Sequence, residues 1–261
     1  EQVHLSTFTR NPSTIPFTDG LEPWVYINPA GSELFVARKG SPVSILRFGI
    51  PFNFTGIQAL ASGENSVPCM TPDVNGQFLY LGCNTSPPKV IKFNVNSLSR
   101  ETALTLQADD APLLSAATDP VGRYAYFLRN TPGDDIGRVI RVDLENFTRV
   151  NDLNNPGLII RYAIQIVMEP NGHYLLCVLP LGNGTIAKVS LDSSNVARAI
   201  RFTLNQPSSV QSAHFYAHAV VPMRRESAAL FDANQFAPKC SVMGNGQNGY
   251  FGTGTYPGQV V

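Results

Sequence analysis

Four histidines and two pairs of adjacent aspartates are the side chains best suited to acid–base or metal chemistry in this sequence. His214 and His218 have the i, i+4 spacing of a helical zinc pair, but residues 212–221 read as a strand. On a strand that spacing separates the two side chains by about 13 Å, too far for one metal ion. Asp109–Asp110 and Asp134–Asp135 lie in polar loops that suit either calcium or solvated turns. We predict no metal site and no cofactor.

The motifs of common enzymes are missing from the chain. It has no Gly-x-Ser-x-Gly elbow, no phosphate-binding loop and no His-Glu-x-x-His. Nineteen basic and nineteen acidic residues cancel, with no run of either sign, which argues against a nucleic-acid surface. No apolar stretch approaches the length of a membrane-spanning helix. The sequence therefore predicts a non-enzymatic protein without nucleic-acid partners or a membrane span.

An internal repeat organises most of the chain. Three copies occupy residues 68–106, 115–153 and 165–204, and a fainter copy begins at Trp24. Each copy reads as a short apolar strand, a glycine turn, an aromatic strand, a polar loop, an alternating third strand and a fourth strand. The copies follow one another at about 43 to 53 residues, the period of four-stranded propeller blades.

The third strand of each copy alternates between apolar and polar side chains. Ile91, Phe93 and Val95 share one face, while Lys92 and Asn94 take the other. This alternation is typical of a half-buried strand. An isolated four-stranded sheet would leave its apolar face in water, so neighbouring sheets must stack. We predict an all-β fold, a β-propeller of five or six four-stranded blades, as a single domain over residues 1–261.

Aromatic and arginine side chains recur at fixed repeat positions. Core packing is the preferred interpretation for the aromatic residues, over stacking on sugars at a rim. The arginines read as structural, linking a blade edge to a neighbour. The two sets are Trp24, Tyr80, Tyr124 and Tyr126, and Arg10, Arg100, Arg149 and Arg198.

The two ends of the chain read as complementary parts of one repeat. Residues 249–261 correspond to a second strand and the start of a third, and residues 1–10 match the end of a third strand and the turn into a fourth. Residues 1–10 either close the ring in their own chain or insert into the next molecule, which would build a filament. The strand residues assigned to this closure or assembly are Val3, Leu5, Phe8, Tyr250, Val260 and Val261. Residues 222–240 are too short for a full blade and form a degenerate blade or an insertion.

The repeat resembles the YVTN/NHL-like β-propeller superfamily. The resemblance rests on Tyr250-x6-Pro257-Gly258-x-Val260-Val261 followed by Leu5-x-x-Phe8-Thr9-Arg10, a unit similar to repeats of secreted protist and bacterial proteins. It implies the fold, and it leaves the function open because such rings host lectins, hydrolases, receptors and scaffolds.

Cysteines and glycosylation sequons favour an extracellular or cell-surface location. Cys69 and Cys83 flank a turn centred on Gly76, so they would face each other and form either a disulfide or two buried thiols. Cys177 and Cys240 have no local feature that pairs them. The start at Glu1 suits a processed N-terminus. The Asn-x-Ser/Thr sequons are at Asn53, Asn84, Asn146 and Asn183.

These observations predict a secreted, glycosylated structural propeller. Its partner would be a further copy of itself, head to tail, in a filament or surface layer, or an extracellular protein or glycan. A monomeric carbohydrate- or protein-binding propeller is the first alternative, and a propeller hydrolase is the second.

Overall fold

The computed structural model describes a protein built almost entirely from β-strands. The described residues are 2–4, 9–11, 24–38, 40–50, 53–110, 112–129, 137–150, 160, 163–179, 185–191, 199–203, 240–243 and 249–252. They belong to two compact units, Glu1–Asp109 and Asp110–Val261, each described here by itself. In these ranges the one helix is a short 3-10 turn, Ala108–Asp110, and none has the length and hydropathy of a membrane span.

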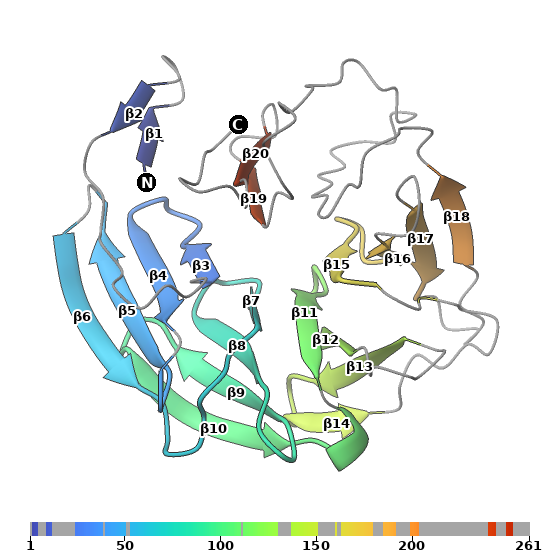
Figure 1. Ribbon diagram of the computed structural model, residues 1–261, viewed down its shortest axis with the longest axis horizontal. Helices are drawn as coiled ribbons and strands as arrows, with labels where there is room; N and C mark the ends of the chain where they lie inside the picture. The colour runs from blue at the N-terminus through green and yellow to red at the C-terminus, as the bar shows by residue number, and fades with distance from the viewer. Residues whose placement is uncertain are drawn as a thin grey trace. The chain divides into compact units, whose positions relative to one another are not determined.

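The first unit contains two four-stranded sheets in which sequential strands pair antiparallel (Figure 1). One sheet consists of β3 (Trp24–Ile27), β4 (Glu33–Arg38), β5 (Ser44–Gly49) and β6 (Asn53–Ala59). The other consists of β7 (Cys69–Pro72), β8 (Phe78–Cys83), β9 (Lys89–Asn94) and β10 (Ser99–Thr105).

The second unit repeats this plan twice (Figure 1). Its sheets are β11 (Leu113–Thr118), β12 (Tyr124–Arg129), β13 (Arg138–Asp143) and β14 (Thr148–Val150), then β15 (Gln165–Met168), β16 (Tyr174–Leu179), β17 (Thr185–Ser190) and β18 (Ala199–Thr203). Each predicted copy of the repeat is therefore one four-stranded sheet, which confirms the all-β, propeller-like prediction. The single domain, the ring and its five or six blades stay predictions.

Two further sheets have two strands each. β1 (Gln2–His4) pairs with β2 (Thr9–Asn11), and β19 (Cys240–Met243) pairs with β20 (Gly249–Gly252). In the N-terminal hairpin His4 pairs with Thr9, as Asp143 pairs with Thr148 in the β13–β14 hairpin. The N-terminal segment thus has the register of a third-to-fourth-strand hairpin.

The residues assigned to closure or assembly are described only in part. Val3 lies in β1 and Tyr250 in β20. Leu5, Phe8, Val260 and Val261 lie outside the described residues, as do residues 222–239 of the predicted degenerate blade.

One turn design joins the first two strands of every four-stranded sheet. A side-chain oxygen accepts backbone N–H groups four residues on, and a glycine three residues on has a positive φ near +70°. The pairs are Asn28 with Gly31, Asp73 with Gly76, Asp119 with Gly122, and Glu169 with Gly172.

Gly76 is also needed for the approach of two sheets within the first unit. A Cβ there would lie 2.8 Å from Cδ of Pro29, in the corresponding turn of the preceding sheet. Gly172 has the same relation to Pro120 within the second unit, at 2.9 Å. These glycines let successive turns stack directly.

Within each unit, apolar faces of neighbouring sheets pack together in a buried core. In the first unit Phe35 and Ile45 pack with Leu79, Ile91 and Phe93, all fully or almost fully buried. In the second unit the core joins the β11–β14 and β15–β18 sheets. The predicted apolar face of the third strand is confirmed by the burial of Ile91, Phe93 and Val95. The corresponding residues of the next two sheets are buried as well: Ile140, Val142, Leu144, Ala187 and Val189.

Candidate functional site

The side chains considered above for acid–base or metal chemistry do not form a common site among the described residues. His173 is exposed beside the β15–β16 turn. Among the described residues no group of three His, Cys, Asp or Glu side chains could hold a metal ion. His214, His218, Asp134 and Asp135 lie outside the described residues.

Asp110 belongs instead to an ion pair with Arg149. Arg149 Nε donates to Oδ2 of Asp110 at 2.8 Å, and Nη2 donates to Oδ1 at 3.0 Å. Asp110 is fully buried just before β11, and Arg149 lies in β14 of the same sheet. The pair links β14, the fourth strand of this sheet, to the segment that leads into β11, its first strand.

Glu64 and Arg100 repeat this arrangement in the first unit. Arg100 in β10 donates from Nε and Nη2 to the two carboxylate oxygens of Glu64, at 3.0 and 2.8 Å. The backbone N–H of Ala61 donates to the same carboxylate at 2.9 Å. Burial alone would raise the pKa of Glu64, but the Arg100 and Ala61 hydrogen bonds and the charges of Arg100 and Lys89 outweigh it and lower that pKa.

We call these two ion pairs the carboxylate–arginine clasps. The sequence predicted a structural role for these arginines. It did not identify their carboxylate partners, or that each pair joins the fourth strand of a sheet to the segment before its first strand. A usable signal exists, because Glu64 and Asp110 each lie nine residues before a turn-capping aspartate, Asp73 or Asp119. A bidentate pair to a buried carboxylate fixes geometry, so the clasps are structural devices.

The recurring tyrosines also pack in the protein. Tyr80 and Tyr126 are almost fully buried. Burial, reinforced by the nearby carboxylates of Asp73 and Asp119 respectively, raises the pKa of each to about 12. Tyr124 is half-buried, with the guanidinium groups of Arg123 and Arg141 each 4.9 Å from its ring centre. Core packing is confirmed for Tyr80 and Tyr126, and the Trp24 side chain lies outside the described residues.

The predicted facing geometry of Cys69 and Cys83 is wrong. Cys69 pairs with Gly82 across β7–β8, so Cys83 is one residue out of register and lies on the other side of the sheet. The reason is the turn, in which Asp73 and Phe78 close a loop of four residues and shift the centre of symmetry off Gly76. Both cysteines are buried free thiols, and so is Cys177. The Cys240 side chain lies outside the described residues.

Three of the four sequons fall where the structure is described. Asn53 begins β6 and is exposed, and Asn146 is exposed in the β13–β14 turn. Asn84 is half-buried just after β8. Asn183 lies outside the described residues. Glycosylation stays a prediction at all four.

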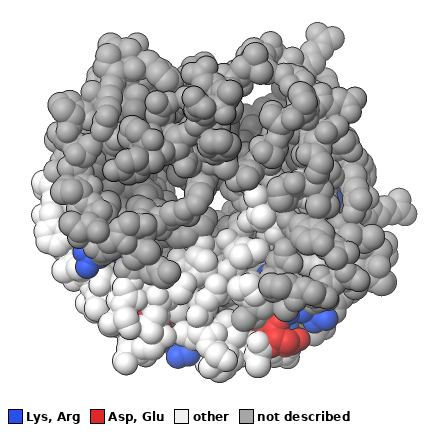
Figure 2. Space-filling view, viewed as in Figure 1, with Lys and Arg blue, Asp and Glu red and all other residues white. Residues whose placement is uncertain are grey.

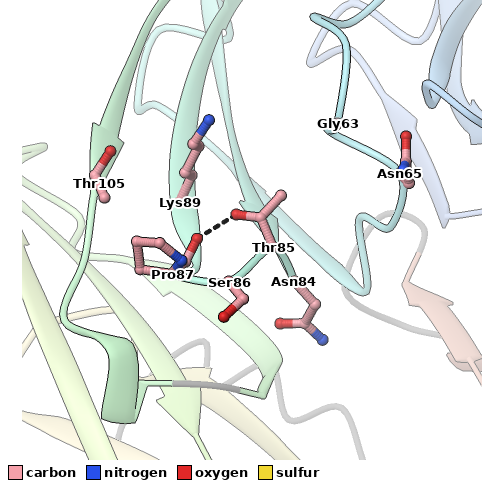
Figure 3. Close-up of a pocket in the computed structure, with 8 residues that line it drawn as sticks. All are labelled: Gly63, Asn65, Asn84, Thr85, Ser86, Pro87, Lys89 and Thr105. Atoms are coloured by element: carbon pink, nitrogen blue, oxygen red, sulfur yellow. Dashed lines mark hydrogen bonds between the residues drawn. The ribbon is translucent and has the colours of Figure 1, made fainter.

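A pocket in the first unit gathers polar side chains from three segments of the chain (Figure 3). Its volume is about 530 Å³. The first segment precedes β7, the second is the β8–β9 connection with the start of β9, and the third is the end of β10. The lining residues are Gly63, Asn65, Asn84, Thr85, Ser86, Pro87, Lys89 and Thr105.

The walls of this pocket are fixed by backbone pairing. Lys89 pairs with Cys83 on one side and with Thr105 on the other. The N–H of Asn84 donates to the carbonyl of Ser66 at 2.9 Å, and the Thr85 hydroxyl donates to the carbonyl of Pro87 (Figure 3). The pocket is thus a feature of the folded sheet and its connections.

Charge is sparse on the described surface. In the view of Figure 2 that surface is mostly uncharged, with scattered basic and acidic side chains. This agrees with the low share of charged residues in the sequence, 15%.

The fold and its repeats define the class as propeller-like all-β proteins. No family model and no curated protein matches the sequence. Similar solved structures include Kuenenia stuttgartiensis hydrazine synthase (15% identity, TM-score 0.57, 97% of this chain and 68% of that one), a putative 6-phosphogluconolactonase from Bacteroides fragilis (21%, 0.54, 71% and 56%) and U3-55K (14%, 0.52, 68% and 50%). The chain spans about two thirds of the first structure and about half of the other two. At these identities the likeness extends to the fold alone.

Proposed function

We propose that this protein is a non-catalytic, extracellular propeller-type building block that assembles by completing a shared blade. In this proposal residues 2–11 supply the third and fourth strands of a blade, and residues 240–252 supply its first and second strands. When the two halves come from different molecules, the contact is head to tail and generates a filament or layer. When they come from one molecule, the same pairing closes a ring.

One observation carries the proposal. The β1–β2 hairpin has the register of the β13–β14 hairpin inside a complete four-stranded sheet. A two-stranded hairpin is at best marginally stable in water, so it gains from pairing with further strands. The β19–β20 hairpin offers such strands. Its two strands are consecutive in the chain and pair antiparallel, as the first two strands of each four-stranded sheet do.

The test is native mass by light scattering over a concentration series, for the full chain and for a chain lacking residues 1–11. Assembly predicts polymers that grow with concentration for the full chain and monomers for the truncated one. A steady monomer of the full chain would refute assembly.

A peptide provides the matched control for this test. A synthetic peptide of residues 1–11 should bind the truncated chain, and the same peptide with Val3→Asp and Leu5→Asp should not. Equal binding of both peptides would show that strand completion is not the cause.

A second candidate function is a monomeric binding module. The observation that favours it is the polar pocket around Lys89, whose lining comes from three segments and includes paired strands. A hydrolase is less well supported, because the buried carboxylates of Glu64 and Asp110 are already held by arginines.

A further inference from the structure

The pocket around Lys89 has the size and composition of a site for one small polar ligand. Its volume of about 530 Å³ falls within the usual range of small-ligand sites. None of its eight lining residues is aromatic or acidic. The side chains that line it offer hydroxyl groups, two amides and one ammonium group, which suit a ligand with several oxygen atoms.

The charge beside the pocket is positive. The carboxylate of Glu64, between lining residues Gly63 and Asn65, is neutralised by its two hydrogen bonds from Arg100. Lys89 then adds one further positive charge. Within the described part of the chain, the Lys89 ammonium group makes no hydrogen bond or ion pair, although its charge lowers the pKa of Glu64. An anionic group on the ligand would give this ammonium a partner.

The ammonium group is also carried by a fixed backbone. Lys89 begins β9 between two paired strands, and the Leu106 N–H donates to the Pro88 carbonyl at 2.9 Å beside it. In Figure 3 the Lys89 side chain extends away from the 84–87 connection, with Thr105 on one side and Asn65 on the other. A ligand would meet the charge with a polar wall on each side.

We propose that this pocket binds an acidic sugar ring, of the uronic-acid type, with its carboxylate paired to Lys89. The amides of Asn65 and Asn84 and the hydroxyls of Ser86 and Thr105 hydrogen-bond the ring hydroxyls. This inference rests on the second candidate function, binding by the pocket, and is independent of assembly.

The test uses the full chain without a glycan at Asn84. It is titrated separately with glucuronate, glucose and inorganic phosphate, and binding is measured by calorimetry or NMR. Glucuronate should bind most tightly, and its affinity should fall with salt. Lys89→Gln should weaken glucuronate binding about tenfold or more, because it removes the charged partner. Lys92→Gln is the matched control, since it removes the same charge from the same strand, where Lys92 lies over the Phe78 ring. Its glucuronate affinity should stay within about twofold of the parent value.

Three results would overturn the proposal: no glucuronate binding, equal loss in Lys89→Gln and Lys92→Gln, or phosphate binding as tight as glucuronate. The last would mean that the pocket recognises an anion without the sugar ring. Light scattering on the same samples separates these outcomes from a failure of assembly.

Discussion

Replacing Arg100 should expose how much the carboxylate–arginine clasp contributes to stability. The Glu64 carboxylate is 0% exposed. Arg100→Met removes both of its hydrogen bonds from Arg100 and leaves it the hydrogen bond from the Ala61 N–H. Removing one partner of a fully buried pair costs about 3–5 kcal/mol. The Arg100 side chain is 26% exposed, so water offsets part of this, and we expect a loss of about 2–3 kcal/mol.

The matched control is Arg47→Met in the same unit. Arg47 also pairs with a carboxylate, Glu33, but both side chains are partly exposed, at 29% and 24%. A pair of this kind contributes about 1 kcal/mol or less. The measurement is urea unfolding followed by circular dichroism, with midpoints compared at equal slope. Equal losses in the two variants would refute the argument from burial.

The loss in Arg100→Met should also depend on pH. In the parent protein the lowered pKa of Glu64 adds stability that is present above its ordinary value of 4.5 and is lost as pH falls through the lower folded value. Without Arg100, burial raises that pKa, so the variant loses stability as pH rises. The stability difference between the two proteins should therefore be largest near neutral pH and shrink in acid. A difference independent of pH would mean that Glu64 is not its source, and Glu64→Gln should remove part of the cost of Arg100→Met.

Other features of the structure give further expected outcomes. Gly76→Ala should cost about 2–4 kcal/mol in urea unfolding, from backbone strain and a clash with the neighbouring turn. Gly31→Ala, at the same φ of +66° with no atom within 4 Å, should cost about 1–2 kcal/mol; equal costs would contradict the clash. Burial raises the pKa values of Cys69 (to about 12) and Cys83, so both should resist a thiol reagent at pH 8 until urea unfolds the protein. Intact mass should show no disulfide between them, and rapid native labelling would contradict their burial. In a secreting eukaryotic host, Asn146→Gln should remove the mass of one glycan, and an unchanged mass would contradict glycosylation at this site.

The sequence predicted the sheets well because their determinants are local. Alternation of Ile91, Phe93 and Val95 with polar neighbours specifies which face of β9 is buried, and the structure confirms it. The glycine turns mark where each first strand ends, so the repeat boundaries agree with the strands within a few residues. Neither inference needs contacts between distant residues.

The misses came from geometry that local patterns do not specify. Whether Cys69 faces Cys83 depends on the number of residues in one turn, and a change of one residue moves a side chain to the other face. The Glu64–Arg100 clasp joins residues 36 apart, and the equivalent position in the next sheet holds aspartate instead of glutamate. The pocket is lined by three separate segments of the chain, so no single sequence motif predicts it.

The stacked glycine turns have a consequence for protein engineering. At Gly76 and Gly172 even one methyl group would collide with a proline of the preceding sheet, so extra residues cannot be accommodated there without separating the sheets. Peptide tags, epitopes or new binding loops should therefore be kept away from Gly76 and Gly172, and libraries should leave the glycine turns untouched.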